Sequence, residues 1–355
     1  MIQGTTLDNL VASVIRDAQD RKDFIVSTAD LKMGTESNRI AMRGRDNSSI
    51  IFDPTDHAHG QIAQSAAIPG GFYNRLRSEY PAELAQVVNA IWHKDPSNRM
   101  LRTLRGNLRA FPSDKYRRID NDKVLAQVLP VVRERGYEIK SCQVTEERLY
   151  LHIVSARIQG EVRVGDVVQS GFLLTNSEIG MGSFTMTEMD FRLACLNGMV
   201  HPGKQVRRHV GARQELSTLS YEELATDTQE ATDKALYLQL RDEIDRLTSP
   251  ETFQARLRRL QEAADTSVVE RGVSPVDTMK SVAKALELSQ EEHTAALTNF
   301  LTSNDFTRWG LANAITSVAN EHPRYDRAVE LEAVGGRIMA MPTRELWEMV
   351  EVGRA

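Results

Sequence analysis

The chain has 355 residues, of which 41% are hydrophobic and 26% are charged, and its formal net charge is −5. This composition is typical of a soluble globular protein with one large or two smaller domains. It excludes a membrane-spanning protein, because no apolar run approaches the roughly 20 residues that a membrane helix needs. The N-terminus also lacks the basic start and apolar core of a signal peptide. The only two cysteines, Cys142 and Cys195, have no metal-type spacing, so we expect reduced thiols in the cytosol.

The charge is distributed unevenly along the chain. Lysine and arginine counted against aspartate and glutamate give about −2 for residues 1–98, +7 for 99–213 and −10 for 214–355. A basic centre between acidic flanks is consistent with a polyanionic partner. It is equally consistent with two packed domains whose charges complement each other.

The first hundred residues predict short elements. Apolar residues at helical spacing indicate an amphipathic helix over 4–22, capped by Thr6 or Asp8, and a short strand follows over 24–27. We expect loops and a small hairpin over 33–60. The remaining elements of this region are predicted to be helices, over residues 57–67, 72–77 and 81–92.

The segment 101–111 combines two conflicting signals. Its leucines recur at helical spacing, but Gly106-Asn107 favours a turn between two strands, and we prefer the hairpin. Seven basic residues against the single acid Asp114 lie between Arg99 and Arg118. Such a cluster is either a solvated face, partly ion-paired, or a set of phosphate contacts.

The centre of the chain predicts an antiparallel sheet. A helix over 121–135 precedes three strands over 137–143, 148–158 and 161–169, with a turn at Gln159-Gly160. A glycine-containing loop and a short strand then lead to a helix over 187–196, in which Asp190 would complete the N-terminal cap. From about residue 218 the chain is predicted to be helical, with restarts at Ser249, Ser274, Ser289 and Asn304.

The expected fold class is therefore α+β. A central twisted antiparallel sheet with packed helices is followed by an all-α C-terminal region. The expected divisions are an N-terminal helix with a small β and loop region over 1–60, an α+β core over 61–213 and a helical region over 214–355.

Two basic clusters flank this sheet, and the second follows His201-Pro202-Gly203. Tyrosine beside arginine suits stacking on bases along a charged groove, although buried tyrosines are commoner. The candidate nucleic-acid contacts are Arg102, Arg105, Arg109, Lys115, Tyr116, Arg117, Arg118, Lys204, Arg207 and Arg208.

A second set of polar residues lies near the glycine-containing loop that follows Gly171. These side chains could form a pocket, with or without a divalent metal, although their spacing matches no known metal loop and Asp120 suits a turn or cap. The pocket candidates are Asp120, Asn121, Asn176, Ser177, Glu178, Arg192 and Asn197.

Five segments together resemble a known family: IPGGFYNRL (68–76), RAFPSDKYRRIDN (109–121), NSEIGMGSF (176–184), RLACLNGMV (192–200) and NAITSVAN (313–320). They are similar to the phage/plasmid-like protein family, domain of unknown function 932, over about residues 60–205 and more loosely in the tail. The resemblance implies a mobile-element protein of the bacterial cytoplasm and no defined reaction. Pro112 stands where many members have leucine.

The family's polar positions fall on many of the candidate residues and on a few neighbours. They are Arg109, Ser113, Tyr116, Arg117, Asp120, Asn121, Asn176, Ser177, Glu178, Arg192, Asn197 and Gly198. At the level of fold, a sheet crossed by a helix with basic residues on one edge is similar to single-strand annealing proteins such as the phage recombinases.

These observations lead us to expect a non-catalytic, homo-oligomeric phage or plasmid protein that binds or anneals single-stranded DNA in recombination or repair. No cofactor is required for that role. Two alternatives stay open: a metal-dependent enzyme acting on a nucleotide or phosphorylated substrate, and a phage protein whose acidic helical tail binds a host factor.

Overall fold

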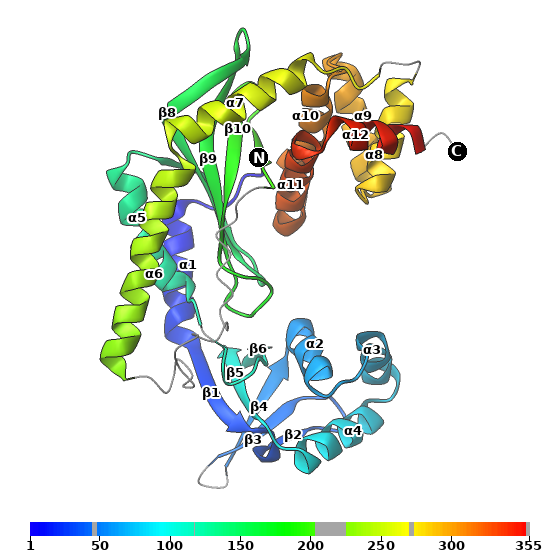
Figure 1. Ribbon diagram of the computed structural model, residues 1–355. Helices are drawn as coiled ribbons and strands as arrows, with labels where there is room; N and C mark the ends of the chain where they lie inside the picture. Colours follow the sequence, from blue (N-terminus) through cyan, green and yellow to red (C-terminus); the bar gives the residue numbers. More distant parts are fainter. Residues whose placement is uncertain (45–47, 117, 203–224, 270–272, 353–355) are drawn as a thin grey trace.

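The computed structural model describes residues 1–44, 48–116, 118–202, 225–269 and 273–352. It contains two β-sheets, one below the other in Figure 1, and a group of C-terminal helices beside the upper sheet. The expected α+β class with a helical C-terminal region is confirmed. None of the helices in the described ranges is long and apolar enough to cross a membrane.

The lower sheet is mixed and has six strands, in the order β1-β5-β6-β4-β3-β2. Only β4 and β6 run parallel. The strands are β1 (Arg21–Ser27), β2 (Leu31–Met33), β3 (Ile40–Arg43), β4 (Ser49–Pro54), β5 (Asn98–Leu104) and β6 (Asn107–Ala110). The expected hairpin over 101–111 is confirmed, with its turn at Arg105 and Gly106, which both have positive φ. The small hairpin expected within 33–60 is confirmed, because β3 and β4 pair antiparallel.

Three helices cover one face of this sheet (Figure 1). They are α2 (Asp56–Ser65), α3 (Gly70–Glu79) and α4 (Pro81–Lys94), as the sequence predicts. The core between helices and sheet contains Trp92, Phe111 and Phe52, and the ring of Phe24 lies 5.8 Å from that of Phe52. Side chains alternate along a strand, so Ile25 and Ile51 lie on the opposite face, where both are exposed.

Helix α1 (Leu7–Asp20) joins the two sheets. It begins at Thr6, whose hydroxyl accepts the backbone N–H of Asn9, and it ends directly at Arg21, the first residue of β1. Leu10 and Val14 of α1 are buried in the core of the upper sheet. The chain therefore begins on the upper unit before it enters the lower one.

The upper sheet is antiparallel throughout, in the order β11-β10-β9-β8-β7. Its strands are β7 (Glu138–Val144), β8 (Leu149–Arg163), β9 (Asp166–Asn176), β10 (Thr185–Arg192) and β11 (Asn197–Val200). The predicted turn at Gln159-Gly160 is wrong, because β8 continues through it to a turn at Gly165, which has φ +80°. Gly160 instead allows a close approach of Leu257.

The predicted helix over 187–196 is also wrong. Residues 187–192 belong to β10, which pairs with β9 and β11. Both faces of this strand are largely buried, so the two-residue alternation of a half-exposed strand is absent. Asp190 is consequently not a helix cap but a buried strand residue.

Helices enclose the upper sheet and form the C-terminal group. They are α5 (Asn121–Glu134), α6 (Thr226–Leu247), α7 (Pro250–Asp265), α8 (Pro275–Ala285), α9 (Gln290–Ser303), α10 (Arg308–Val318), α11 (Tyr325–Ala340) and α12 (Thr343–Val352); short 3-10 turns cover Thr28–Asp30 and Ala319–Glu321. The expected starts at Ser249, Ser274 and Ser289 are confirmed, because each hydroxyl caps its helix. Asn304 ends α9 with positive φ, and α10 begins after Thr307.

Candidate functional site

Charged side chains connect the two sheets at a single junction. Arg21, at the start of β1, donates to Glu178 Oε1 at 2.9 Å and lies 3.0 Å from Asp120 Oδ2. Glu178 belongs to the loop that follows β9 of the upper sheet, and Asp120 precedes α5. One arginine of the lower sheet thus holds two carboxylates of the upper unit.

Arg102 of β5 is the most enclosed member of this junction. It is 2% exposed, and its guanidinium donates to Asp23 at 3.1 Å, to Asp120 at 2.7 Å and to the backbone oxygen of Glu178 at 2.6 Å. Burial opposes ionisation of Asp120, but Arg102 and Arg21 outweigh it and hold the pKa of that carboxyl below its ordinary value. Asp120 is therefore held as a carboxylate between these two arginines.

In the described part of the chain, Glu178 is the carboxylate of the upper unit with the most partners in this junction. Besides Arg21, it accepts the backbone N–H of Asn121 at 2.9 Å, at the first residue of α5, and pairs with Arg109 of β6 at 3.3 Å. A carboxylate is favoured at a helix N-terminus by the unpaired N–H groups and the dipole. Asn176 donates to Asn121 Oδ1 and to the Ile119 carbonyl, each at 2.8 Å, which fixes the approach to α5.

Five of the seven predicted pocket residues come together here: Asp120, Asn121, Asn176, Ser177 and Glu178. All five are buried, and the Ser177 hydroxyl donates to the Glu147 carbonyl at 2.9 Å. Tyr116 packs beside them, where burial raises the pKa of its hydroxyl to about 12.

The other two predicted pocket residues lie elsewhere. Arg192 binds Asp166 through Nε at 2.6 Å and Nη2 at 2.9 Å, and its guanidinium lies over the ring of Trp309. Asn197 donates to the Asn313 carbonyl and accepts from Asn320. Both fasten the outer strands of the upper sheet to α10 and the turn that follows it.

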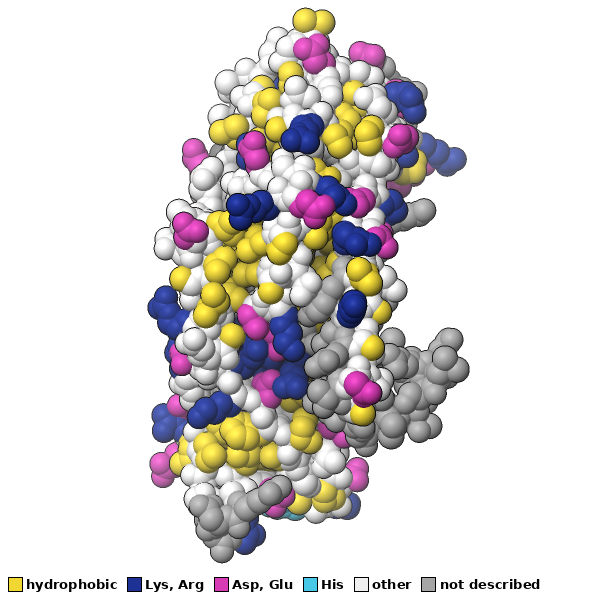
Figure 2. Space-filling view, turned by 90° about the vertical axis from the view of Figure 1, so that its left-hand side faces the viewer, with side chains coloured by type: hydrophobic (Ala, Val, Ile, Leu, Met, Phe, Trp, Pro, Cys, Tyr) yellow, Lys and Arg dark blue, Asp and Glu magenta, His cyan; other side chains and the backbone are white. Residues whose placement is uncertain are grey.

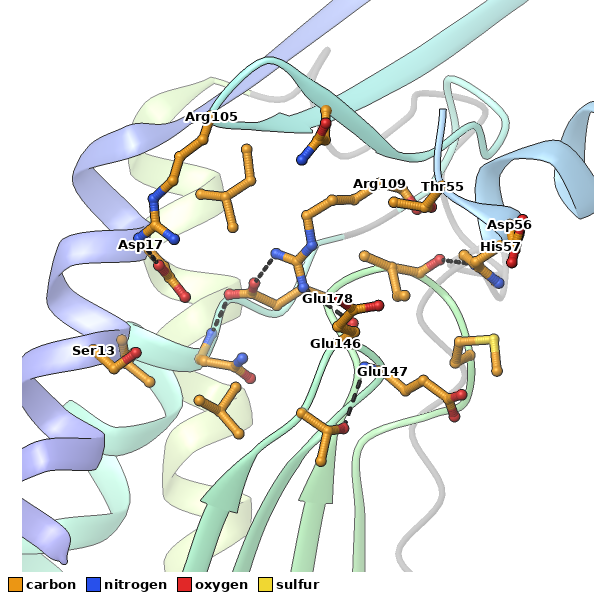
Figure 3. A pocket seen from close by; sticks show the side chains of 18 residues that line it. Ser13, Asp17, Thr55, Asp56, His57, Arg105, Arg109, Glu146, Glu147 and Glu178 are labelled. Carbon is orange, nitrogen blue, oxygen red and sulfur yellow. Dashed lines mark hydrogen bonds and ion pairs between the residues drawn. The ribbon is translucent and has the colours of Figure 1, made fainter. Parts of the chain in front are cut away.

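A cleft of about 570 Å³ opens beside the junction (Figure 3). Arg109 points from β6 toward Glu178, and Arg105 points toward Asp17 on α1. The acidic groups that line the cleft come from both units: Asp17, Asp56, Glu146, Glu147 and Glu178. They outnumber the two arginines, which are both ion-paired, so the cleft itself is acidic.

Carboxylates alone do not make this cleft a metal centre. In the part of the chain that the structure describes, no three His, Cys, Asp or Glu side chains are grouped so that they could hold a metal ion. The arginines that hold Asp120 and Glu178 also occupy the oxygens that a cation would need.

The predicted nucleic-acid contacts differ in how far they are exposed and in whether they are already ion-paired. Arg102 is enclosed, and Arg109 is largely so. Arg105 pairs with Asp17 and Asp20 but keeps 51% of its side chain exposed, Arg118 pairs with Asp23 at 2.9 Å, and Lys115 is exposed. The remaining candidates, Arg117, Lys204, Arg207 and Arg208, lie outside the described residues.

Sequence reasoning missed the partners of these arginines. Asp17, Asp20 and Asp23 come from the end of α1 and the start of β1, far upstream of the arginines that they bind. Arg21 of the same stretch binds Asp120 and Glu178. The only signal was the alternation of opposite charges in the segment DAQDRKD, which ends at Asp23. It did not show which residues it would meet.

One comparison with known proteins gave a match. The family described as Domain of unknown function (DUF932) matches residues 110–335. The chain belongs to this family. The match omits residues 60–109, which the sequence resemblance had included, and extends through most of the helical tail. No curated protein and no solved structure matches the chain.

Proposed function

We propose that this DUF932 protein binds single-stranded nucleic acid across the junction of its two sheets, as a phage or plasmid protein acting in recombination or repair. The observation that carries the proposal is the set of exposed cations on segments that meet there. Lys22 follows Arg21 on β1, Lys115 lies in the loop after β6, and Lys123 lies in the first turn of α5.

Figure 2 shows the side of the molecule on which α1, α5 and α6 lie in Figure 1. Lysine and arginine side chains gather across the middle of that face, with acidic side chains among them and hydrophobic areas above and below. Arg105 and Arg118 keep part of their side chains exposed while they are ion-paired. In the proposed complex the enclosed Arg102 positions the surface, and the exposed cations neutralise phosphates.

Binding to a fluorescent single-stranded oligonucleotide at several salt concentrations tests the proposal. The triple variant Lys22→Glu/Lys115→Glu/Lys123→Glu should bind at least tenfold more weakly. Its slope of log affinity against log salt should also be shallower, by about 0.7 for each phosphate that the variant no longer neutralises. The control is Lys280→Glu/Lys284→Glu on α8, which carries two exposed lysines far from the junction. It should bind as the parent protein does.

Two results would contradict the proposal. One is the absence of binding at micromolar protein in low salt, and the other is an equal loss in both lysine variants. We also propose that the protein works as a homo-oligomer in the bacterial cytoplasm. Native mass spectrometry with and without the oligonucleotide tests the oligomeric state. A monomer under both conditions would count against that part alone.

A further inference from the structure

A second polar cavity lies in the upper unit, away from the junction. Its volume is about 60 Å³, and it is lined by residues that follow β11 and by residues of β10, α7 and α11. Glu188, His201, Arg256 and Arg259 supply its polar wall, and Leu260 and Met339 part of its apolar wall. The junction and its cleft share none of these residues.

Asp190 does not line the cavity but binds two residues that do, Arg256 and His201. It is 1% exposed, accepts from Arg256 Nη2 at 3.2 Å and lies 2.7 Å from His201 Nε2. Burial opposes its ionisation, but Arg256 and His201 outweigh it and hold the pKa of Asp190 at about 2. Ser170 accepts a further hydrogen bond from Arg256 Nη2 at 3.0 Å. The arginine and the imidazole are thus held in fixed orientations.

In this arrangement a guanidinium N–H group at the cavity has no hydrogen-bond acceptor among the described residues. Arg256 is 4% exposed, and its Nη1 makes no hydrogen bond within the described ranges, although Glu188 Oε2 lies 3.4 Å away. A buried guanidinium N–H without an acceptor is costly, because it has lost its hydration without replacement. Arg259 lies three residues further along α7, is exposed and lines the same cavity. The cavity thus has donors in place for an acceptor-rich group.

We propose that this cavity binds a phosphate group that keeps one proton. Arg256 Nη1 and Arg259 donate to its oxygens, and Glu188 accepts the hydrogen bond of its P–OH group. The size fits, since a water needs about 10–15 Å³ of such a cavity, so there is room for roughly the five heavy atoms of phosphate. Arginine donors are well suited to phosphate oxygens.

Glu188 makes the proposal specific. A carboxylate beside an anion is repulsive unless the anion brings a proton to share between them. Sulfate has the same shape but carries no proton near neutral pH, whereas phosphate does. The site should therefore select phosphate over sulfate, and Glu188→Gln, which supplies an amide donor in place of the carboxylate, should remove the selection.

The phosphate group has two possible sources, the free ion and the 5′ end of a nucleic-acid strand. Both present the same chemistry, and a monoester still carries its proton in about half of the molecules near pH 6. This inference does not depend on the proposed function, because the cavity shares no residue with the junction and the free ion can bind without a strand.

The test uses the full chain at pH 6 and constant ionic strength. Isothermal titration calorimetry and thermal unfolding compare inorganic phosphate with sulfate, and anisotropy compares one oligonucleotide with and without a 5′ phosphate. We expect phosphate to bind at least tenfold more tightly than sulfate and to raise the unfolding temperature more. Arg259→Gln should weaken phosphate binding by roughly tenfold, the loss of one charge-assisted hydrogen bond. Its neighbour Arg258→Gln, exposed but not lining the cavity, is the control.

Each arm has an outcome that overturns the proposal. Equal effects of phosphate and sulfate on the parent protein would exclude a site for a protonated anion, and so would selectivity that survives Glu188→Gln. Equal binding by the Arg258 and Arg259 variants would place any phosphate contact elsewhere. If inorganic phosphate binds and the 5′ phosphate adds no affinity, the free ion is the ligand; a gain that Arg259→Gln abolishes identifies the strand end.

Discussion

Arg21 and Glu178 lie 2.9 Å apart although 157 residues separate them in the sequence. One is the first residue of the lower sheet and the other follows the central strand of the upper sheet. Glu178 is also bound by Arg109 and by the N-terminus of α5, so four segments of the chain meet at one carboxylate. This carboxylate is the natural place to test how firmly the two sheets are joined.

Replacing Glu178 with glutamine should destabilise the protein by about 3 kcal/mol, because Arg21 and Arg109 lose the carboxylate that compensates their partly buried charges. Urea unfolding measures the loss. Glu146→Gln is the control, since that exposed side chain lines the same cleft and only its backbone oxygen contacts Arg109. Equal effects of the two substitutions would show that the junction contributes no specific stability.

His59 predicts a pH dependence of the lower unit. Burial, assisted by the charge of Arg77, lowers its pKa from 6.5 to about 4. The unfolded chain therefore takes up this proton more readily, so the contribution of His59 to stability is complete above pH 6.5 and is lost as the pH falls toward 4. The difference between the two pKa values corresponds to roughly 3 kcal/mol.

Urea unfolding between pH 4 and 7 measures this dependence. His59→Gln should flatten the slope between pH 6.5 and 4. Tyr73→Phe removes the hydroxyl that lies 2.9 Å from His59 Nδ1 but keeps the imidazole, so it should lower stability without abolishing the slope. An unchanged slope in the His59 variant would assign the pH dependence to other groups.

Two glycine substitutions should have opposite signs. A Cβ at Gly336 of α11 would overlap the carbonyl oxygen of Val200 in β11, so Gly336→Ala should cost about 3 kcal/mol. A Cβ at Gly60 of α2 would meet nothing within 4 Å, so Gly60→Ala should stabilise by roughly 0.5–1 kcal/mol. Thermal unfolding of both variants checks the pair. A harmless Gly336→Ala would mean that α11 can move away from the sheet.

Asp166 should be a further point of attachment for the C-terminal helices. It accepts two hydrogen bonds from Arg192 and one, at 2.9 Å, from Trp309 Nε1. Asp166→Asn should cost about 2 kcal/mol, because a bidentate ion pair becomes a single hydrogen bond from Arg192 to a neutral amide oxygen. Trp309→Tyr provides a comparison in which the Arg192 pair remains. Unfolding midpoints within error of the parent protein would contradict this role.

Local signals predicted most of the helices. Ser249, Ser274 and Ser289 each precede a helix and cap it, because the serine hydroxyl accepts a backbone N–H of the first turn that has no partner within the helix. The hairpin at Gly106 also followed from local turn chemistry. The sequence placed Asn176, Ser177 and Glu178 near Asp120 because they lie where a predicted strand ends and a loop begins. Polar functional side chains are common in such loops.

The errors arose where burial replaced local preference. In β10 both faces are covered, so the alternation of a half-exposed strand is missing. Met189, together with Leu193 in the turn after β10, imitated helical spacing, and Asp190 imitated a cap. Its partner Arg256 comes 66 residues later, on a helix whose position the sequence did not indicate. For the arginines near residue 105, ion pairing was one of two alternatives, but their carboxylates were not identified, because these lie on a helix and strand far upstream.

The route of α1 has a practical consequence for dissecting the molecule. The segment that matches the family starts at residue 110, yet Leu10 and Val14 fill the hydrophobic interior of that segment. A fragment that starts at residue 110 would lack α1, so the apolar side chains that Leu10 and Val14 cover would be exposed and the fragment would aggregate. The lower sheet and its helices are an insertion between α1 and the rest of the upper unit. A shortened protein should therefore lack residues 21–111 and join residue 20 to residue 112 through a short linker.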